Sequence, residues 1–175
     1  MDDEPDDSIA RVRATLAAAA ARLRAGGARD EALGEYVEPR RILGIRRDPT
    51  MRSLGRVWRL GAILLSDDGS IWATGSITRV TEPGRPQHQS TSAEIRRAYR
   101  AAALRGHFGA GDTVNHGAVP IPLDGSLRSS DGPVFLRGET AFVRWSTTAG
   151  DADAVLLEDY LADRVDLLVQ PPAGA

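Results

Sequence analysis

A single stretch of the sequence places two apolar segments on either side of a strong turn signal. Residues 56–80 read RVWRLGAILLSDDGSIWATGSITRV, with Asp68-Gly69 at the centre. Asp-Gly between apolar segments is typical of a two-residue β-hairpin loop. With that loop Leu64 faces Ala73, and one face of the hairpin is apolar. We therefore expect antiparallel strands. Such strands are joined by short hairpins, so the fold should belong to a class in which consecutive segments of the chain pair with each other.

Helical and extended patterns alternate along the rest of the chain. The spacing of apolar residues predicts helices over residues 8–25, 91–104 and 153–169, and a weaker pattern predicts a short helix over 30–37. Thr91 and Glu94 have the spacing of a capping box. Residues 113–123 are extended, and a second hairpin joins 133–137 to 140–146 around Gly138-Glu139, with Trp145 on its apolar face. The predicted fold is α+β, with an antiparallel sheet built from two β-hairpins and helices packed mainly on one face.

Length and composition are those of one soluble domain. The chain has 175 residues, of which 42% are apolar and 26% charged. We expect a disordered acidic tail at 1–7, a globular domain at 8–170 and a flexible tail at 171–175. The acidic start has neither the basic nor the apolar region of a secretory signal, and the apolar runs are shorter than a membrane span. We therefore expect a cytoplasmic protein.

Two residue types are missing, and their absence excludes several chemistries. The chain has no cysteine, which rules out disulfides, thiol nucleophiles and cysteine-ligated metals. It also has no lysine, so all 22 basic residues are arginine. A phosphate-binding loop with its lysine, a Schiff base and a serine–lysine pair are therefore impossible. The sequence predicts no cofactor.

The segment EPRRILGIRRDP, residues 38–49, carries four arginines in two pairs around a short apolar centre. The middle of the chain is basic while both ends are acidic, so that the arginines have carboxylates of the same chain as partners. We interpret the pairs as structural. A phosphate site, a nucleic-acid site or a partner surface is the alternative, and it would use Arg40, Arg41, Arg46 and Arg47.

Other candidate site residues are few. His107, Asp112 and His116 lie close together in the sequence, and two histidines with a carboxylate can hold a metal ion, although their spacing fits no helical motif. We interpret the histidines as isolated polar or half-buried side chains, with the metal site as the alternative. Trp72 falls on the more polar face of the first hairpin, which makes it a candidate for a partner surface.

The segments EPRRILGI, WRLGAILLSDDGSIWATG and VRWS…YLADRVDLL resemble a group of short uncharacterised bacterial proteins. The likeness covers most of the chain. Some members carry a glutaminase label, so the resemblance implies amide hydrolysis as one activity. Glutaminases use a serine–lysine pair or a cysteine nucleophile, and this chain has neither lysine nor cysteine. The resemblance therefore assigns no catalytic residue.

The sequence favours a small non-enzymatic interaction or accessory domain that acts through protein contacts. An amide hydrolase of another mechanism is the first alternative, and an arginine-dependent binder of nucleic acid or phosphate is the second. A net charge of only −2 gives no general attraction to nucleic acid or to an anionic membrane, so we expect neither as a partner. Nothing in the sequence indicates an oligomeric state.

Replacing the four arginines of residues 38–49 by glutamine separates the structural interpretation from an anion site. If the arginines pair with the chain's own carboxylates, the variant loses about 1–3 kcal/mol of unfolding free energy, and less at high salt. Urea unfolding at two salt concentrations measures this loss. A binding site for duplex DNA would instead show a log–log salt slope of about −0.9 per phosphate in the wild type, and the variant would lose binding at unchanged stability.

Overall fold

The structure is a computed structural model that describes residues 6–38, 41–42, 45–46, 48–82, 90–146 and 150–171, and only the backbone of 41, 42, 45 and 46. Contacts between Cα atoms divide the chain into two compact units. The first unit comprises Met1–Asp30, Val57–Thr74 and Val119–Ala175, and the second comprises Glu31–Arg56 and Gly75–Ala118. Each unit is thus assembled from segments that lie far apart in the sequence.

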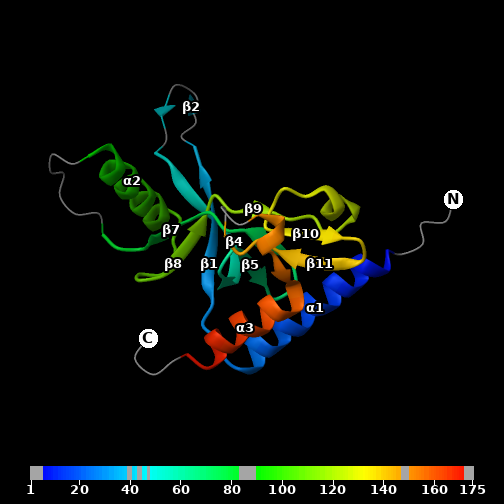
Figure 1. The fold of residues 1–175 in the computed structure, drawn as a ribbon. Helices are drawn as coiled ribbons and strands as arrows, with labels where there is room; N and C mark the ends of the chain where they lie inside the picture. The colour runs from blue at the N-terminus through cyan, green and yellow to red at the C-terminus, as the bar shows by residue number, and fades with distance from the viewer. Residues whose placement is uncertain are drawn as a thin grey trace. The chain divides into compact units, whose positions relative to one another are not determined.

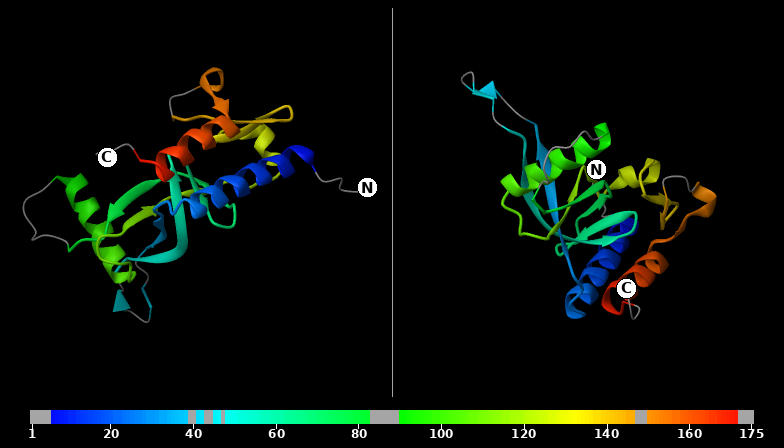
Figure 2. Two further views of the ribbon diagram at one scale, coloured as in Figure 1. Left: turned by 90° about the horizontal axis from the view of Figure 1, so that it is seen from below. Right: turned by 90° about the vertical axis from the view of Figure 1, so that its left-hand side faces the viewer.

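Two helices lie side by side in the first unit (Figures 1 and 2). They are α1 (Asp7–Ala25) and α3 (Leu157–Val169). Asp6 caps α1 by accepting a hydrogen bond from the Ser8 N–H at 3.1 Å, so the helix begins one residue earlier than expected. Arg22 near the end of α1 pairs with Asp166 near the end of α3 at 2.5 Å. The two helices therefore run in the same direction.

The strands of the first unit form two groups. The C-terminal part of β4 (Thr50–Leu60) is followed in strand order by β5 (Ile63–Ser66), β6 (Ile71–Ala73) and β9 (Val119–Pro120). A separate three-stranded sheet contains β10 (Val134–Arg137), β11 (Thr140–Val143) and β12 (Val155–Leu156). Short 3-10 helices occupy Gly125–Ser129 and Asp151–Asp153. All pairings within these groups are antiparallel.

One apolar core joins these strands to the two helices. Its buried members from the helices include Leu16, Leu23, Leu161 and Val165, and its members from the strands include Trp58, Leu60, Ile63, Leu65, Ile71, Val134, Leu136 and Val143. The apolar positions that the sequence places on one stripe of each helix are the ones that enter this core. Helix α3 begins at Leu157 and not at residue 153, because a 3-10 turn and β12 precede it.

The register predicted for the first hairpin is wrong by one residue. Leu64 lies opposite Trp72 and not opposite Ala73. The cause is a loop of three residues, 67–69, closed by a hydrogen bond from the Ser66 N–H to the Ser70 carbonyl oxygen at 3.0 Å. Gly69, at the last loop position, has a φ of 83°, as three-residue hairpin loops require. A one-residue slip exchanges the faces of the second strand.

The stretch also contains a second turn, which the sequence analysis did not predict. Leu60 pairs with Ile63, so Gly61-Ala62 forms a two-residue loop between β4 and β5, and Gly61 has a φ of 72°. A glycine at the first loop position is the usual requirement of such a turn. The segment is therefore a three-stranded meander. The hairpin of β10 and β11, in contrast, has the pairing that Gly138-Glu139 predicts, with Arg137 opposite Thr140.

The second unit contains a parallel strand pair. Residues Glu31–Val37 form strand β1 and not the short helix predicted for 30–37. β1 pairs in parallel with β8 (Thr113–His116), which pairs antiparallel with β7 (Ser76–Arg79), so that the order is β7-β8-β1-β4. Glu31 and Glu35 are four residues apart, a spacing that fits a short helix, and the pairing with β8 makes the segment a strand instead.

Helix α2 (Thr91–Arg105) packs on β7 in the second unit (Figure 1). Its bounds match the prediction, although Ser90 is the N-cap in place of Thr91 and makes no capping hydrogen bond through its side chain. A second core unites Ala102 and Ala103 of α2 with Ala32, Met51 and Val114. A two-stranded ladder, β2 (Arg41–Ile42) with β3 (Ile45–Arg46), completes the unit.

The predicted α+β class is confirmed, and the strand pairing is mixed but mostly antiparallel. None of the helices in the described residues has the length and apolarity that a membrane crossing requires.

A buried tyrosine joins α3 to the turn between β4 and β5. The Tyr160 hydroxyl donates a hydrogen bond to the Leu60 carbonyl oxygen at 2.6 Å and accepts one from the Ala62 N–H at 2.8 Å. The side chain is only 4% exposed. A Cβ atom on Gly61 would come within 2.5 Å of the same hydroxyl oxygen. The turn therefore requires glycine both for its backbone angle and for the approach of Tyr160.

Tyr160→Phe keeps the ring in the core but leaves both backbone groups without their partner. Unsatisfied buried polar groups are costly, so the variant should lose about 1–3 kcal/mol of unfolding free energy, measured by urea denaturation. The matched control is Tyr99→Phe, since no hydrogen bond of the Tyr99 hydroxyl is found among the described residues. Equal losses in both variants would show that the two hydrogen bonds do not hold the turn.

Candidate ligand-binding pocket

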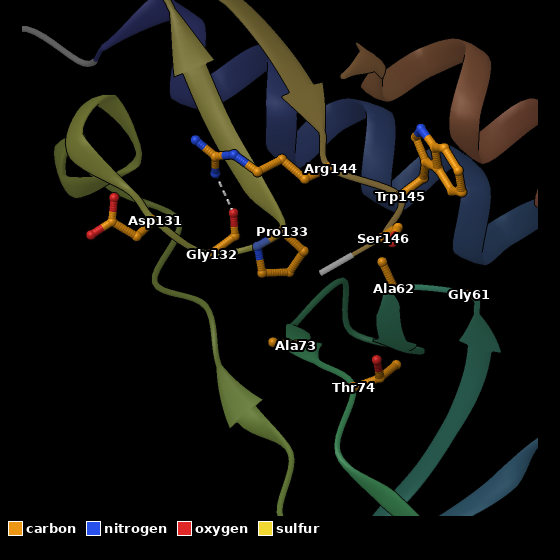
Figure 3. A pocket seen from close by; sticks show the side chains of 10 residues that line it. All are labelled: Gly61, Ala62, Ala73, Thr74, Asp131, Gly132, Pro133, Arg144, Trp145 and Ser146. Atoms are coloured by element: carbon orange, nitrogen blue, oxygen red, sulfur yellow. Dashed lines mark hydrogen bonds between the residues drawn. The ribbon is translucent and has the colours of Figure 1, made fainter. Parts of the chain in front are cut away.

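A pocket of about 360 Å³ opens in the first unit between two sets of turns (Figure 3). Gly61 and Ala62 come from the loop between β4 and β5, and Ala73 and Thr74 come from the end of β6. Residues 131–133 precede β10, and residues 144–146 follow β11. The volume suits one large side chain or a small organic ligand.

Backbone pairing brings the floor of the pocket together. Ile63 lies opposite Ala73 in the ladder of β5 and β6, and the Thr74 N–H donates to the Ala62 carbonyl oxygen at 3.1 Å. The loop Gly61-Ala62 and the end of β6 are therefore neighbours. Gly61 has only a hydrogen atom as its side chain, and Ala62 and Ala73 have methyl groups, so the floor of the pocket is apolar. The hydroxyl of Thr74 adds one polar group beside it.

Arg144 makes several hydrogen bonds along the rim of the pocket. Its guanidinium donates to the carbonyl oxygens of Ser130, at 3.1 Å, and Gly132, and it pairs with Asp151 at 2.7 Å. Figure 3 shows the side chain reaching the Gly132 carbonyl. The guanidinium carbon also lies 4.0 Å from the centre of the Phe135 ring. Because the side chain is only 17% exposed and its Nε and Nη1 groups are engaged in these hydrogen bonds, Arg144 shapes the rim of the pocket.

Trp145 forms a wall of the pocket and is 53% exposed. The sequence analysis placed it on the apolar face of the second hairpin, which is wrong. Strand β11 ends at Val143, so the alternation of faces does not continue to Trp145. The indole N–H donates to the Asp153 carbonyl oxygen at 3.2 Å, which orients the ring. An exposed tryptophan with its N–H hydrogen-bonded is typical of recognition surfaces.

The lining of the pocket combines apolar and polar side chains. Its polar side chains are two hydroxyls, Thr74 and Ser146, the guanidinium of Arg144 and the exposed carboxylate of Asp131. No histidine lies among the described residues of the lining. An apolar floor, an aromatic wall and peripheral hydroxyls suit an apolar group with a hydrogen-bonding edge.

The candidate metal ligands all lie in the second unit and are not arranged as a metal site. Within the described residues no three histidine, aspartate or glutamate side chains could hold a metal ion. His107 is exposed, with a φ of 60°, and Asp112 pairs with Arg56 at 3.4 Å. His116 is 4% exposed and lies against Tyr99, with ring centres 4.4 Å apart. Closeness in sequence did not bring the three side chains together.

The arginine pairs fall mostly outside what the structure describes. Arg40 and Arg47 lie outside the described residues, and of Arg41 and Arg46 only the backbone is described, as one pair in the β2–β3 ladder. Their structural interpretation therefore stays a prediction. Trp72 is half-buried and lines a shallow cavity with Pro120 and Leu123. Its role in a partner surface also stays a prediction.

The pocket was not found from the sequence, although weak signals of it existed. Gly61 followed by alanine between two apolar runs is a turn signal, but Asp68-Gly69 dominated the interpretation of the stretch. Arg144-Trp145-Ser146 continued an alternating pattern and was counted as strand. No local pattern tells that these two segments meet, because their closeness depends on packing of the whole unit.

Comparisons of the chain with protein-family models, with curated proteins and with solved structures give no match. The functional interpretation therefore depends on the geometry of the described residues.

Burial makes the second unit sensitive to acid through His116. Loss of solvent around the ring lowers the pKa of His116 below its ordinary value of 6.5, so the folded protein favours the neutral imidazole. The unfolded chain takes up the proton at the ordinary pKa, and unfolding free energy is therefore lost as the pH falls below about 6.5. His116→Gln should show a smaller loss between about pH 7.5 and pH 5.5 than the wild type.

Urea unfolding at several pH values measures this difference, and His107→Gln is the matched control at an exposed position. If the unfolding free energy of the wild type and of His116→Gln fell equally as the pH is lowered, the acid sensitivity would not come from His116.

Proposed function

We propose that the protein is a non-enzymatic binding domain that acts through contacts with another polypeptide, and that the pocket at Trp145 receives an apolar side chain of that partner. The observation that carries the proposal is the exposed Trp145 ring, which its hydrogen bond to Asp153 holds beside a preformed floor of Gly61, Ala62 and Ala73. Tryptophan is the residue type most enriched among the anchors of protein interfaces.

Rigidity of the rim supports this proposal. A pocket that is already formed in the free protein loses little conformational entropy when it is filled. Arg144 connects Ser130, Gly132 and Asp151 through hydrogen bonds, and the Arg144 N–H donates to the Pro133 carbonyl oxygen at 2.8 Å. Both sides of the rim are therefore tied together without a ligand. The hydroxyl of Thr74 at the edge of the pocket offers a hydrogen-bonding group to the backbone of a bound peptide.

Capped amino acids test whether the pocket accepts an apolar side chain. The N-acetyl methylamides of leucine, phenylalanine and tryptophan should shift the indole N–H resonance of Trp145 in ¹⁵N-edited NMR spectra, and the alanine derivative should not. Ala73→Phe fills the floor and should abolish these shifts, because the ring would occupy the space of the ligand. The half-buried position of Ala73 at an open pocket makes an unchanged fold the expected background.

A matched substitution outside the pocket, Ala93→Phe at a half-buried position in the first turn of α2, should leave the shifts intact. Equal shifts from the alanine derivative would contradict recognition of an apolar side chain. Release of ammonia from glutamine or simple amides, lost in Ala73→Phe, would replace the binding proposal by the amide hydrolase alternative.

A further inference from the structure

A second depression lies along α3 and shares Trp145 with the pocket. This groove has a volume of about 630 Å³ and is lined by Trp145, Val155 and the outer face of α3. Three large apolar side chains are exposed in it, namely Trp145 at 53%, Leu167 at 47% and Val155 at 39%. Exposed apolar side chains that gather in one groove mark an interaction surface more strongly than scattered ones do.

The same groove carries a stripe of carboxylates. Asp159, Asp163 and Asp166 follow one another at spacings of four and three residues, which places them on one face of α3. All three are exposed. Asp166 is paired with Arg22, but within the described part of the chain no arginine pairs with Asp159 or Asp163. Arg164 also lines the groove, and its guanidinium lies over the Tyr160 ring, 5.4 Å from its centre, so the groove holds one cation beside its three carboxylates.

The needs of the helix itself do not account for this stripe. Acidic residues stabilise the first turn of a helix, and Asp159 lies there. Asp163 lies beyond the first turn and Asp166 lies near the end, where a negative charge is unfavourable. Arg22 offsets the charge of Asp166, whereas that of Asp163 has no such partner among the described residues.

We infer that the groove binds a basic amphipathic segment of another protein. Arginine or lysine side chains of the segment contact Asp159 and Asp163, and its apolar side chains contact Trp145 and Leu167. The Cβ atoms of residues four apart on a helix are separated by about 6 Å, a spacing that suits two cationic side chains on neighbouring turns of a partner helix. This inference rests on the proposed function, since it names the class of polypeptide that the Trp145 surface recognises.

The probe is a synthetic amphipathic peptide with a stripe of arginines beside a stripe of leucines, and its matched partner carries glutamine at every arginine position. Both are titrated into the full chain, and binding is followed by the Trp145 indole resonance and by the fluorescence polarisation of labelled peptide. The arginine peptide should bind more tightly than the glutamine peptide at low salt. Added salt should bring the two affinities together, because exposed charges are screened.

Asp159→Asn with Asp163→Asn should weaken the arginine peptide by about tenfold, the effect of two exposed ion pairs, and leave the glutamine peptide unchanged. The matched control is Glu82→Gln with Glu94→Gln, which removes the same charge from exposed positions of the second unit. This control should change neither affinity by more than about twofold.

The outcomes separate the groove from the pocket. If both peptides shift the Trp145 resonance equally and the asparagine variant binds as the wild type does, the basic partner is wrong and the proposed function stands. If neither peptide shifts the resonance, the binding surface itself is contradicted. If the control variant weakened binding of the arginine peptide as much as the asparagine variant does, the peptide would be attracted by the net charge of the protein and not by Asp159 and Asp163. Sedimentation that shows dimers, lost in Trp145→Ser, would assign the groove to a second copy of the chain.

Discussion

The Tyr160 hydroxyl is the contact on which the first unit depends. It bonds both the carbonyl oxygen of Leu60 and the N–H of Ala62, so one side chain of α3 fixes the turn between β4 and β5. That turn supplies the floor of the pocket, and the helix that carries Tyr160 supplies the acidic face of the groove. The Tyr160 side chain thus contacts elements of both candidate binding surfaces. A loss of this contact is expected to disturb both surfaces at once, because buried polar groups without partners favour rearrangement.

Charge in this protein is balanced over short distances. Several arginines pair with carboxylates of their own unit, as Arg128 does with Asp6 and Arg52 with Glu35. The Arg128 guanidinium and the Ser8 hydroxyl hold the pKa of Asp6 well below its usual value. Such exposed pairs add little stability each. Asp159 and Asp163 have no ion pair among the described residues, and they line the same groove as Trp145, the most exposed aromatic ring of the first unit.

Local rules predicted elements whose stability is local. The stripe Ile9, Val12, Leu16 and Leu23 predicted α1, and Gly138-Glu139 predicted the pairing of β10 with β11. The same rules failed where two local signals competed. The strong turn signal of Asp68-Gly69 led the sequence analysis to miss the turn at Gly61. The loop before β6 is one residue longer than predicted, which shifts the register of β6 by one residue. Residues Glu31–Val37 form a strand because they pair with β8. The sequence of that segment alone does not indicate this pairing.

The sequence by itself determined the α+β class, the course of the three helices and the chemistries that a chain without lysine or cysteine excludes. Those properties follow from periodicity and residue type, which act between neighbours in the chain. Only the tertiary structure decided where the pocket lies, that Trp145 is exposed, and that His107, Asp112 and His116 do not come together as metal ligands. The physical reason is that a binding surface is made by segments distant in sequence, such as residues 61–62 and 144–146, which approach one another only when the whole core is packed.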